Sequence, residues 1–227
     1  MKIGVFWSGG KDSALACYKA ITEGHDVAFI ITFIFSDWPF LCHPMPIMEL
    51  QSEALGIAHL MVKVEEPYRE GYRAVLSRLK KEEGIEGIVT GDIWIEDHRR
   101  WNESVCEGLG IRLIMPLWGL DRYQILNEVI SSGFRCTITC AKQPWFNEGW
   151  LGRELDMDCI KDLKVLNNKY GIDLCGENGE YHTMVIDAPI FKEIIEISSV
   201  SKERRDLVLF LKINQSSLKP KNNWQNF

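Results

Sequence analysis

The segment Ser8-Gly9-Gly10-Lys11-Asp12-Ser13 carries the sharpest chemical pattern in the sequence. It directly follows the short apolar run Ile3 to Trp7, and residues at helical spacing come after it. Two adjacent glycines let a backbone turn tightly and present N–H groups to an anion, and the start of a helix favours phosphate. The serine hydroxyls add hydrogen-bond donors, and Lys11 adds a mobile positive charge. The segment therefore predicts a phosphate-binding site.

Two better-known nucleotide motifs do not match this segment. A Walker A motif has a glycine five places before its second glycine, where this sequence has Val5, and Ser or Thr after its lysine, where it has Asp12. No GxGxxG pattern for a dinucleotide is present. The six residues instead resemble the signature of the PP-loop ATP pyrophosphatases, which grasp the pyrophosphate of ATP as a leaving group. The alternative is an ordinary glycine turn with a capping serine.

Apolar runs and amphipathic segments alternate over the first half of the chain. They predict strands at 3–7, 27–35, 59–64, 87–90 and 111–115, and helices at 14–21, 44–56, 68–83 and 99–109. Five such units in series predict an α/β fold, a doubly wound parallel five-stranded sheet. The resemblance of the loop implies that this sheet is the Rossmann-like one of the PP-loop enzymes. Ligands of such sheets bind beyond the carboxyl ends of the strands. Gly91 and Asp92 follow the fourth strand at that edge, so we expect them to bind ATP together with Ser8 to Ser13.

The pattern changes after Pro116. Further segments predict helices at 121–131 and 158–169, a Trp- and Gly-rich loop at 143–152, and strands around 136–140, 193–197 and 207–213. We interpret residues 1–118 as the ATP-binding domain and residues 119–213 as a smaller, substrate-binding α+β subdomain. Residues 214–227 are polar, so we expect a frayed tail there.

A second motif lies late in the chain, at Gly176-Glu177-Asn178-Gly179-Glu180-Tyr181-His182-Thr183. Together with the short motifs Ala54–Ile57, Gly91-Asp92, Pro116–Trp118 and Trp150–Arg153, it resembles the diphthine–ammonia ligase family. The resemblance extends from residue 1 to about residue 191. In that family the late motif reads Glu-Gly-Gly-Glu-aromatic-Glu-Thr. Here Asn178 stands in place of its middle glycine and His182 in place of its last glutamate.

This resemblance implies a reaction in two halves. ATP adenylates the carboxylate of diphthine, a modified histidine on elongation factor 2, and pyrophosphate leaves; ammonia then displaces AMP to form the amide. Lys11, the loop amides and Mg²⁺ fit the task of neutralising the pyrophosphate, with Asp12 as a ligand or water-mediated partner of the metal. We expect Lys11, Asp12 and Glu180 to be the catalytic residues.

The second substrate is expected to bind at the late motif. Diphthine carries a trimethylammonium group, which proteins bind with aromatic faces and nearby carboxylates. The expected substrate-binding residues are Trp150, Arg153, Glu177, Glu180, Tyr181 and Thr183, with Trp145 as a further aromatic candidate. The alternative is that the tryptophans only pack the subdomain and the glycines only form a hairpin turn.

Other side chains with chemical potential receive structural interpretations. The run Asp97 to Arg100 is either a phosphate clamp or a solvated helix start, and the solvated start is favoured. Cys136 and Cys140 alternate as on a strand, and no second cysteine pair follows, so we expect buried thiols rather than a metal site. His43 and His59 are expected to be structural, whereas a role of His182 as a base stays open.

Composition and net charge indicate which classes of partner and which compartment to expect. The chain has 227 residues, 46% of them hydrophobic, and a formal net charge of -6, which speaks against a nucleic-acid partner. The most apolar run, Val27 to Phe35, is too short to span a membrane. Seven cysteines without framework spacing suit reduced thiols in the cytoplasm. Assembly of several copies stays open.

Two further expectations concern the reaction. Free ammonia is expected as the nitrogen donor, because the sequence shows neither a glutaminase segment nor an obvious cysteine nucleophile. Three alternatives for the function remain: a PP-loop enzyme acting on tRNA, one acting on a small carboxylate, or a sensor that binds nucleotide without turning it over.

Overall fold

A parallel sheet forms the first half of the computed structural model, which describes residues 1–35 and 42–221. Five strands lie in the order β3-β2-β1-β4-β5 and are all parallel. Their bounds are β1 Lys2–Phe6, β2 Asp26–Phe35, β3 Ala58–Val64, β4 Gly87–Val89 and β5 Arg112–Ile114. This order confirms the predicted fold class, because the chain winds outward from β1 in both directions.

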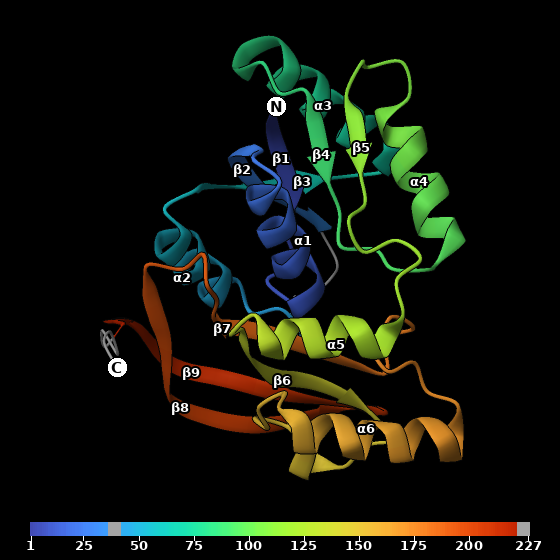
Figure 1. The fold of residues 1–227 in the computed structure, drawn as a ribbon, viewed down its shortest axis with the longest axis vertical. Coiled ribbons are helices and arrows are strands. Elements are labelled where there is room, and N and C mark those ends of the chain that lie inside the picture. Colours follow the sequence, from blue (N-terminus) through green and yellow to red (C-terminus); the bar gives the residue numbers. More distant parts are fainter. Residues whose placement is uncertain (36–41, 222–227) are drawn as a thin grey trace.

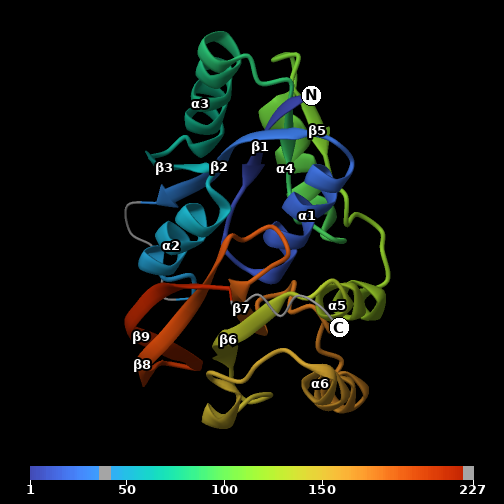
Figure 2. The same cartoon turned by 60° about the vertical axis from the view of Figure 1, so that its left-hand side comes forward.

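Helices cover both faces of this sheet (Figures 1 and 2). The first four are α1 Lys11–Thr22, α2 Met45–Leu55, α3 Tyr68–Glu83 and α4 Glu96–Cys106. Buried residues of α3 and α4 pack with Ile31 and Ile88 on one face, and those of α1 and α2 pack with Ile3 and Val5 on the other. α4 starts three residues before the predicted position. Its first turn carries Glu96 and Asp97, whose charges favour a helix N-terminus but leave no apolar period to detect.

An antiparallel sheet forms most of the second half, with strand order β7-β6-β9-β8. The elements are α5 Arg122–Ser131, β6 Arg135–Lys142, the 3-10 helix η1 Glu148–Trp150, α6 Met157–Tyr170, β7 Tyr181–Asp187, β8 Glu193–Arg205 and β9 Val208–Pro220. The Asp121 side chain caps α5 by accepting a hydrogen bond from the backbone N of Gln124 at 3.0 Å. The predicted division at residue 118 falls between β5 and α5.

The prediction of a frayed tail is wrong for residues 214–220. These residues belong to β9, which pairs with β8 as far as the partners Glu193 and Pro220. Their side chains are polar because this end of the hairpin is largely exposed, while the backbone groups are satisfied by the neighbouring strand. The rest of the predicted tail, residues 222–227, lies outside the described residues.

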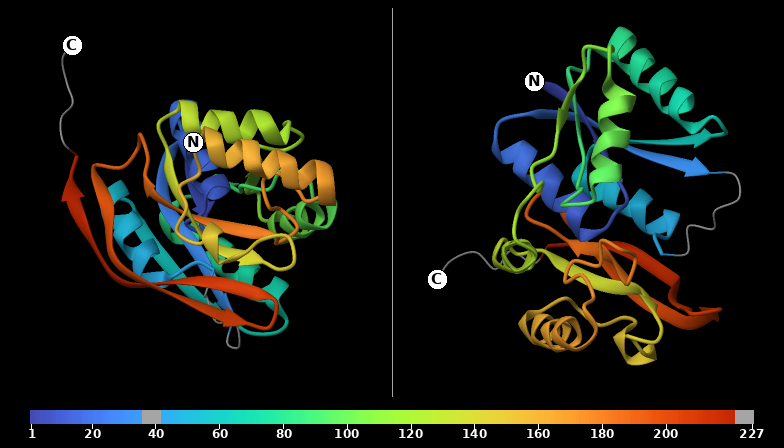
Figure 3. Two further views of the ribbon diagram at one scale, coloured as in Figure 1. Left: turned by 90° about the horizontal axis from the view of Figure 1, so that it is seen from below. Right: turned by 90° about the vertical axis from the view of Figure 1, so that its right-hand side faces the viewer.

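The two sheets meet where the parallel strands end (Figures 1 and 3). The backbone N of Val185 in β7 donates to the carbonyl of Gly9 at 3.0 Å, so the antiparallel sheet contacts the loop that follows β1. The carboxyl edge of the parallel sheet therefore faces the second sheet. Within the described residues, no helix combines the length and the apolar character that crossing a membrane would require.

Candidate active site

The loop between β1 and α1 has a backbone that only glycine can form at its sharpest point. Gly9 has a φ of +75°, and a Cβ there would lie 2.5 Å from Oε1 of Gln51 and 2.7 Å from Cε of Met184. The hydroxyl of Ser13 donates to the carbonyl of Gly10 at 3.1 Å and lies 3.2 Å from the hydroxyl of Ser8. The two serines thus help to hold the predicted phosphate loop in shape.

Gln51, which was not among the residues predicted from the sequence, also holds this loop in place. Its side chain is fully buried; it accepts from Nε1 of Trp7 at 2.9 Å and donates to the carbonyls of Gly9 and Val185 at 2.9 and 2.8 Å. A signal was present, because Gln51 occupies a place on the apolar stripe of α2 otherwise formed by Ile47, Met48, Ala54 and Leu55. A polar side chain on such a stripe needs buried partners.

Lys11 is buried and paired, which corrects the expectation of a mobile charge. Its side chain is only 3% exposed, and Nζ donates to Oδ2 of Asp12 at 2.9 Å and to the carbonyl of Cys175. Nζ also lies 5.3 Å from the ring centroid of Tyr181. Burial alone would lower the pKa of Lys11, but the Asp12 carboxylate raises it overall, so the ammonium group stays charged.

Asp12 keeps one oxygen free. Burial raises its pKa, and the ammonium of Lys11 acts in the opposite direction. Oδ2 holds Lys11, whereas Oδ1 is buried and has no hydrogen-bond partner within the described part of the chain. An unpaired carboxylate oxygen beside a phosphate loop is the kind of hard ligand that Mg²⁺ takes. The structure therefore suits the expectation that Asp12 is a metal ligand.

Gly91 and Asp92 lie against the phosphate loop, as predicted from their place at the end of β4. A Cβ on Gly91 would lie 2.6 Å from the backbone carbon of Asp12 and 2.7 Å from the backbone N of Ser13, so glycine is needed for close packing. The carboxylate of Asp92 accepts from Nδ2 of Asn102 at 2.8 Å and lies 3.1 Å from Nδ1 of His98. Burial would raise the pKa of Asp92, but these hydrogen bonds lower it overall.

His98 has a different environment from its neighbours in the charged run at the start of α4. Asp97 and Arg100 are largely exposed, and Arg99 pairs with Glu103 on the helix surface, as the favoured interpretation of a solvated start expects. His98 instead lines the cavity, and its hydrogen bond to Asp92 raises its pKa. The sequence offers no signal for this difference, which depends on the direction of α4.

Glu177 lines the cavity but is used to hold a loop. Its Oε1 accepts from the backbone N of Ile93 and of Trp94, both at 2.8 Å, and Oε2 lies 3.5 Å from Nη2 of Arg122. These bonds fix the chain between β4 and α4. Thr183 also lines the cavity, and its hydroxyl accepts from the backbone N of Lys11 at 3.2 Å.

Glu180 has a different position from the one expected of a catalytic residue. It is 5% exposed; Oε1 accepts from the backbone N of Asp173 at 2.8 Å and Oε2 from the backbone N of Asn178 at 3.1 Å. Among the described residues that line the cavity, Glu180 is missing. Its carboxylate shapes the loop that offers the Cys175 carbonyl to Lys11, because a buried charge must use its acceptors locally.

The expected aromatic cage does not form. Trp150 packs on Phe146 with ring centroids 5.0 Å apart, and Arg153 lies over Trp150 and pairs with Asp162 at 2.7 Å. Neither Trp150 nor Arg153 belongs to the described lining of the cavity. Trp145 lines a separate surface depression, whereas Tyr181 contributes to the lining of the main cavity but is itself buried beneath Lys11. The alternative of packing holds for these tryptophans.

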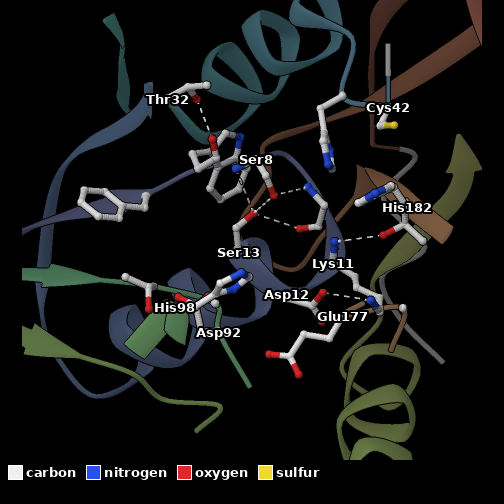
Figure 4. Close-up of a pocket in the computed structure, with 18 of the residues that line it drawn as sticks. Ser8, Lys11, Asp12, Ser13, Thr32, Cys42, Asp92, His98, Glu177 and His182 are labelled. Carbon is white, nitrogen blue, oxygen red and sulfur yellow. Dashed lines mark hydrogen bonds and ion pairs between the residues drawn. The ribbon is translucent and has the colours of Figure 1, made fainter. Parts of the chain in front are cut away.

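A cavity of about 550 Å³ lies beside the predicted phosphate loop. Of the predicted ATP-binding residues, all but Gly9 line it: Ser8, Gly10, Lys11, Asp12, Ser13, Gly91 and Asp92. In Figure 4, Asp92 and His98 lie on one side of Lys11, and Cys42 and His182 lie on the other. An aromatic wall, missed by the sequence analysis, consists of Phe6, Phe33, Phe35 and Tyr72, with Phe33 and Tyr72 stacked at 3.5 Å between ring centroids.

All seven cysteines lie among the described residues and form no disulfide, and Cys136 and Cys140 are buried in β6. His59 has the structural role predicted for it, since Nε2 lies 2.7 Å from the hydroxyl of Thr32. His43 lines the cavity. His182 lies next to it, with ring centroids 5.0 Å apart.

Two family models and several known proteins match the sequence of this chain. The family model of the diphthamide synthase N-terminal domain matches residues 1–113, and that of the diphthamide synthase C-terminal domain matches residues 121–218. A diphthine–ammonia ligase of Homo sapiens is 27% identical over 88% of this chain and 84% of its own length. One of Schizosaccharomyces pombe is 27% identical over 99% of this chain, which spans only 41% of that relative.

Two solved structures superpose on parts of the chain. A predicted subunit of tRNA methyltransferase from Methanocaldococcus jannaschii has a TM-score of 0.48 at 19% identity, over 83% of this chain and 98% of that one. The U34-tRNA thiolase NcsA from Methanococcus maripaludis has a TM-score of 0.41 at 15% identity, over 57% of this chain and 56% of that one. The two family models together match both halves of the sequence, and the chain belongs to the diphthamide synthase family.

Proposed function

We propose that this chain is an ATP-dependent ligase that forms the amide of diphthamide. It adenylates the carboxylate of diphthine on elongation factor 2, releases pyrophosphate, and then joins ammonia to the activated carbon. The observation that carries this proposal is the buried ammonium of Lys11 beside a phosphate loop at the point where two sheets meet. The relatives named diphthine–ammonia ligase support the same reaction.

The loop supplies the electrostatic part of the reaction. The triphosphate of ATP lies on residues 8–13, beside the N-terminus of α1, whose dipole favours an anion. The Lys11 ammonium is already charged and held by Asp12, so it neutralises the departing pyrophosphate without first being ordered. Mg²⁺, when bound at Oδ1 of Asp12, supplies further positive charge to the phosphates.

The aromatic wall suits the adenine base. Phe33 and Tyr72 are stacked and line the cavity, and Phe6 stands edge-on to both of them. Such a wall gives a flat apolar surface at one end of a site whose other parts are polar, as in most small-molecule sites. ATP therefore extends from these rings to the phosphate loop.

The acceptor enters from the acidic side of the cavity. Asp92 and Glu177 lie there, and their carboxylates attract the trimethylammonium group of diphthine. The acceptor carboxylate is then brought in line with the α-phosphorus by binding, which lowers the entropic part of the barrier. All seven cysteines lie among the described residues and are free thiols, which supports the reducing cytoplasm as the compartment.

The test combines the chain with ATP, ammonium and elongation factor 2 that carries diphthine. We expect AMP and pyrophosphate in equal amounts, and a mass change of the factor from acid to amide. ATP binding without any turnover would instead indicate a sensor. Turnover that requires tRNA or a small carboxylate, and ignores the factor, would assign the chain to another substrate.

A further inference from the structure

Two cysteines and a histidine converge at one side of the cavity, outside the phosphate loop. Sγ of Cys42 lies 2.9 Å from Sγ of Cys140, and one donor atom from each of Cys42, Cys140 and His182 lies within 4.8 Å of the other two. The three residues come from separate parts of the chain: the segment before α2, β6 and β7. Figure 4 shows Cys42 and His182 next to each other at the margin of the cavity.

The fold holds these three residues in place. β6 and β7 pair with an irregularity between Ile138 and Cys140, and this irregularity sets Cys140 directly opposite His182. Side chains opposite each other in an antiparallel pair have Cβ atoms about 5 Å apart. The hydroxyl of Thr139 donates to the carbonyl of Cys42 at 2.7 Å and ties that residue to β6. The cluster is therefore built by sheet register and not by a flexible side chain.

We propose that Cys42, Cys140 and His182 bind a single zinc-class cation, with a fourth coordination position open to the cavity. Zn–S bonds of about 2.3 Å and a Zn–N bond of about 2.0 Å place tetrahedral ligand atoms roughly 3.5–3.8 Å apart. The three donor atoms lie within 4.8 Å of one another, and the two sulfurs, now 2.9 Å apart, would separate by a little under about 1 Å when the ion binds. Thiolate and imidazole ligands favour zinc-class ions over Mg²⁺, so this site is distinct in chemistry from Asp12.

The open position follows from the burial of the ligands. Cys42 and His182 line the cavity, whereas Cys140 is buried behind them and does not belong to its described lining. Three protein ligands with one free position form the arrangement in which zinc takes water or a substrate atom. Here that position faces the cavity assigned to ATP and the acceptor, and an acceptor oxygen can replace the water. This last step rests on the proposed function; metal binding itself does not.

The test replaces zinc by Co²⁺ in the whole chain, without ATP or acceptor. We expect one Co²⁺ per chain, with a sulfur-to-cobalt charge-transfer band and the intense visible bands of tetrahedral coordination. Cys140→Ser and His182→Ala should each weaken binding by more than about 100-fold, since even changes around the ligands weaken it about 10–100-fold. Cys136→Ser, a buried cysteine of the same strand, should keep the spectrum. If Cys140→Ser does not fold, Cys42→Ser at the more accessible ligand replaces it.

Three results would overturn the site. One is the absence of a charge-transfer band in the wild-type chain, and another is a band that survives in Cys42→Ser. The third is a Cys42–Cys140 disulfide, detected by mass analysis in reducing buffer, in a chain that takes up no metal. Because none of these measurements uses ATP or the factor, their outcome does not depend on the proposed ligase reaction.

Discussion

Replacement of Lys11 separates the electrostatic role of this residue from its structural role. Lys11→Met keeps most of the side-chain volume over Tyr181 but removes the ammonium, and Lys11→Ala removes both. In the proposed reaction the charge lies where the pyrophosphate leaves, and removal of one such preorganised contact lowers turnover by about 100–1,000-fold, or about 2.7–4 kcal/mol of transition-state stabilisation. We expect this loss in both variants.

The same replacement also lowers stability, because Lys11 is paired in the folded chain. Its Nζ donates to Asp12 and to the carbonyl of Cys175, and a buried acceptor left without its partner costs about 1–3 kcal/mol. The Asp12 side chain is 30% exposed, so water compensates part of that loss. We expect the free energy of unfolding to fall by about 2–3 kcal/mol, which lowers the Tm of a chain of this size by about 4–12 °C.

Two assays decide between these effects. Thermal unfolding gives Tm, and pyrophosphate release with diphthine-bearing factor and ammonium is measured well below it. Lys19→Met is the matched control. Lys19 lies on the same helix, and its Nζ lies 2.6 Å from Oε1 of Glu128. Neither residue belongs to the described lining of the cavity. This variant should keep normal turnover. A folded Lys11→Met variant that releases pyrophosphate at a near-normal rate would refute the role of the charge.

Four further predictions follow from the site. Gly9→Ala should lower the free energy of unfolding by about 2–4 kcal/mol in urea titration, because of its positive φ and the displacement of Gln51. Glu180→Ala should cost about 2–4 kcal/mol by the same measurement and also weaken ATP binding in calorimetry, since its loop holds Lys11; unchanged stability would contradict this role. Trp150→Ala should leave the KM for the factor unchanged, and a large increase would return Trp150 to the substrate site. His98→Gln should lower the free energy of unfolding more at about pH 5.5 than at about pH 9. The pKa of His98 is raised from 6.5 in the folded chain, so its pairing with Asp92 stabilises fully below pH 6.5 and is lost as the pH rises through the pKa of the folded state. Because the His98 side chain is 54% exposed, the difference stays under about 1 kcal/mol, and equal effects at both pH values would exclude the pairing.

The sequence predicted those parts of the molecule that depend on local residue order. Apolar runs of strand length, separated by amphipathic segments, indicated all five parallel strands, since each buried strand must show its pattern within a few neighbours. The phosphate loop could also be predicted, because its residues form one continuous stretch of backbone: Gly9, Gly10, Lys11 and the two serines. Gly91 and Asp92 could be added from topology alone, since parallel strands end at the same edge.

The late motif shows why residue type was not enough. Glu177, Glu180 and Tyr181 have the chemistry expected of a cation site, but their roles depend on which backbone groups come within hydrogen-bond distance. Glu180 meets the N–H groups of its own loop, and Tyr181 is covered by Lys11. Burial and partner choice are properties of packing, and the spacing of residues along the chain does not contain them.

Residues that act across the fold could be found only from the tertiary structure. Gln51 joins α2 to the phosphate loop and to β7, and the aromatic wall combines residues of β1, β2 and α3. Cys42 and Cys140 are 98 residues apart and meet because the two sheets face each other and because β6 carries an irregularity before Cys140. Sequence alone determined the predicted phosphate loop, since its geometry is local. The walls of the cavity were decided by the packing of one sheet against the other, since contacts between distant segments form only when the chain is folded.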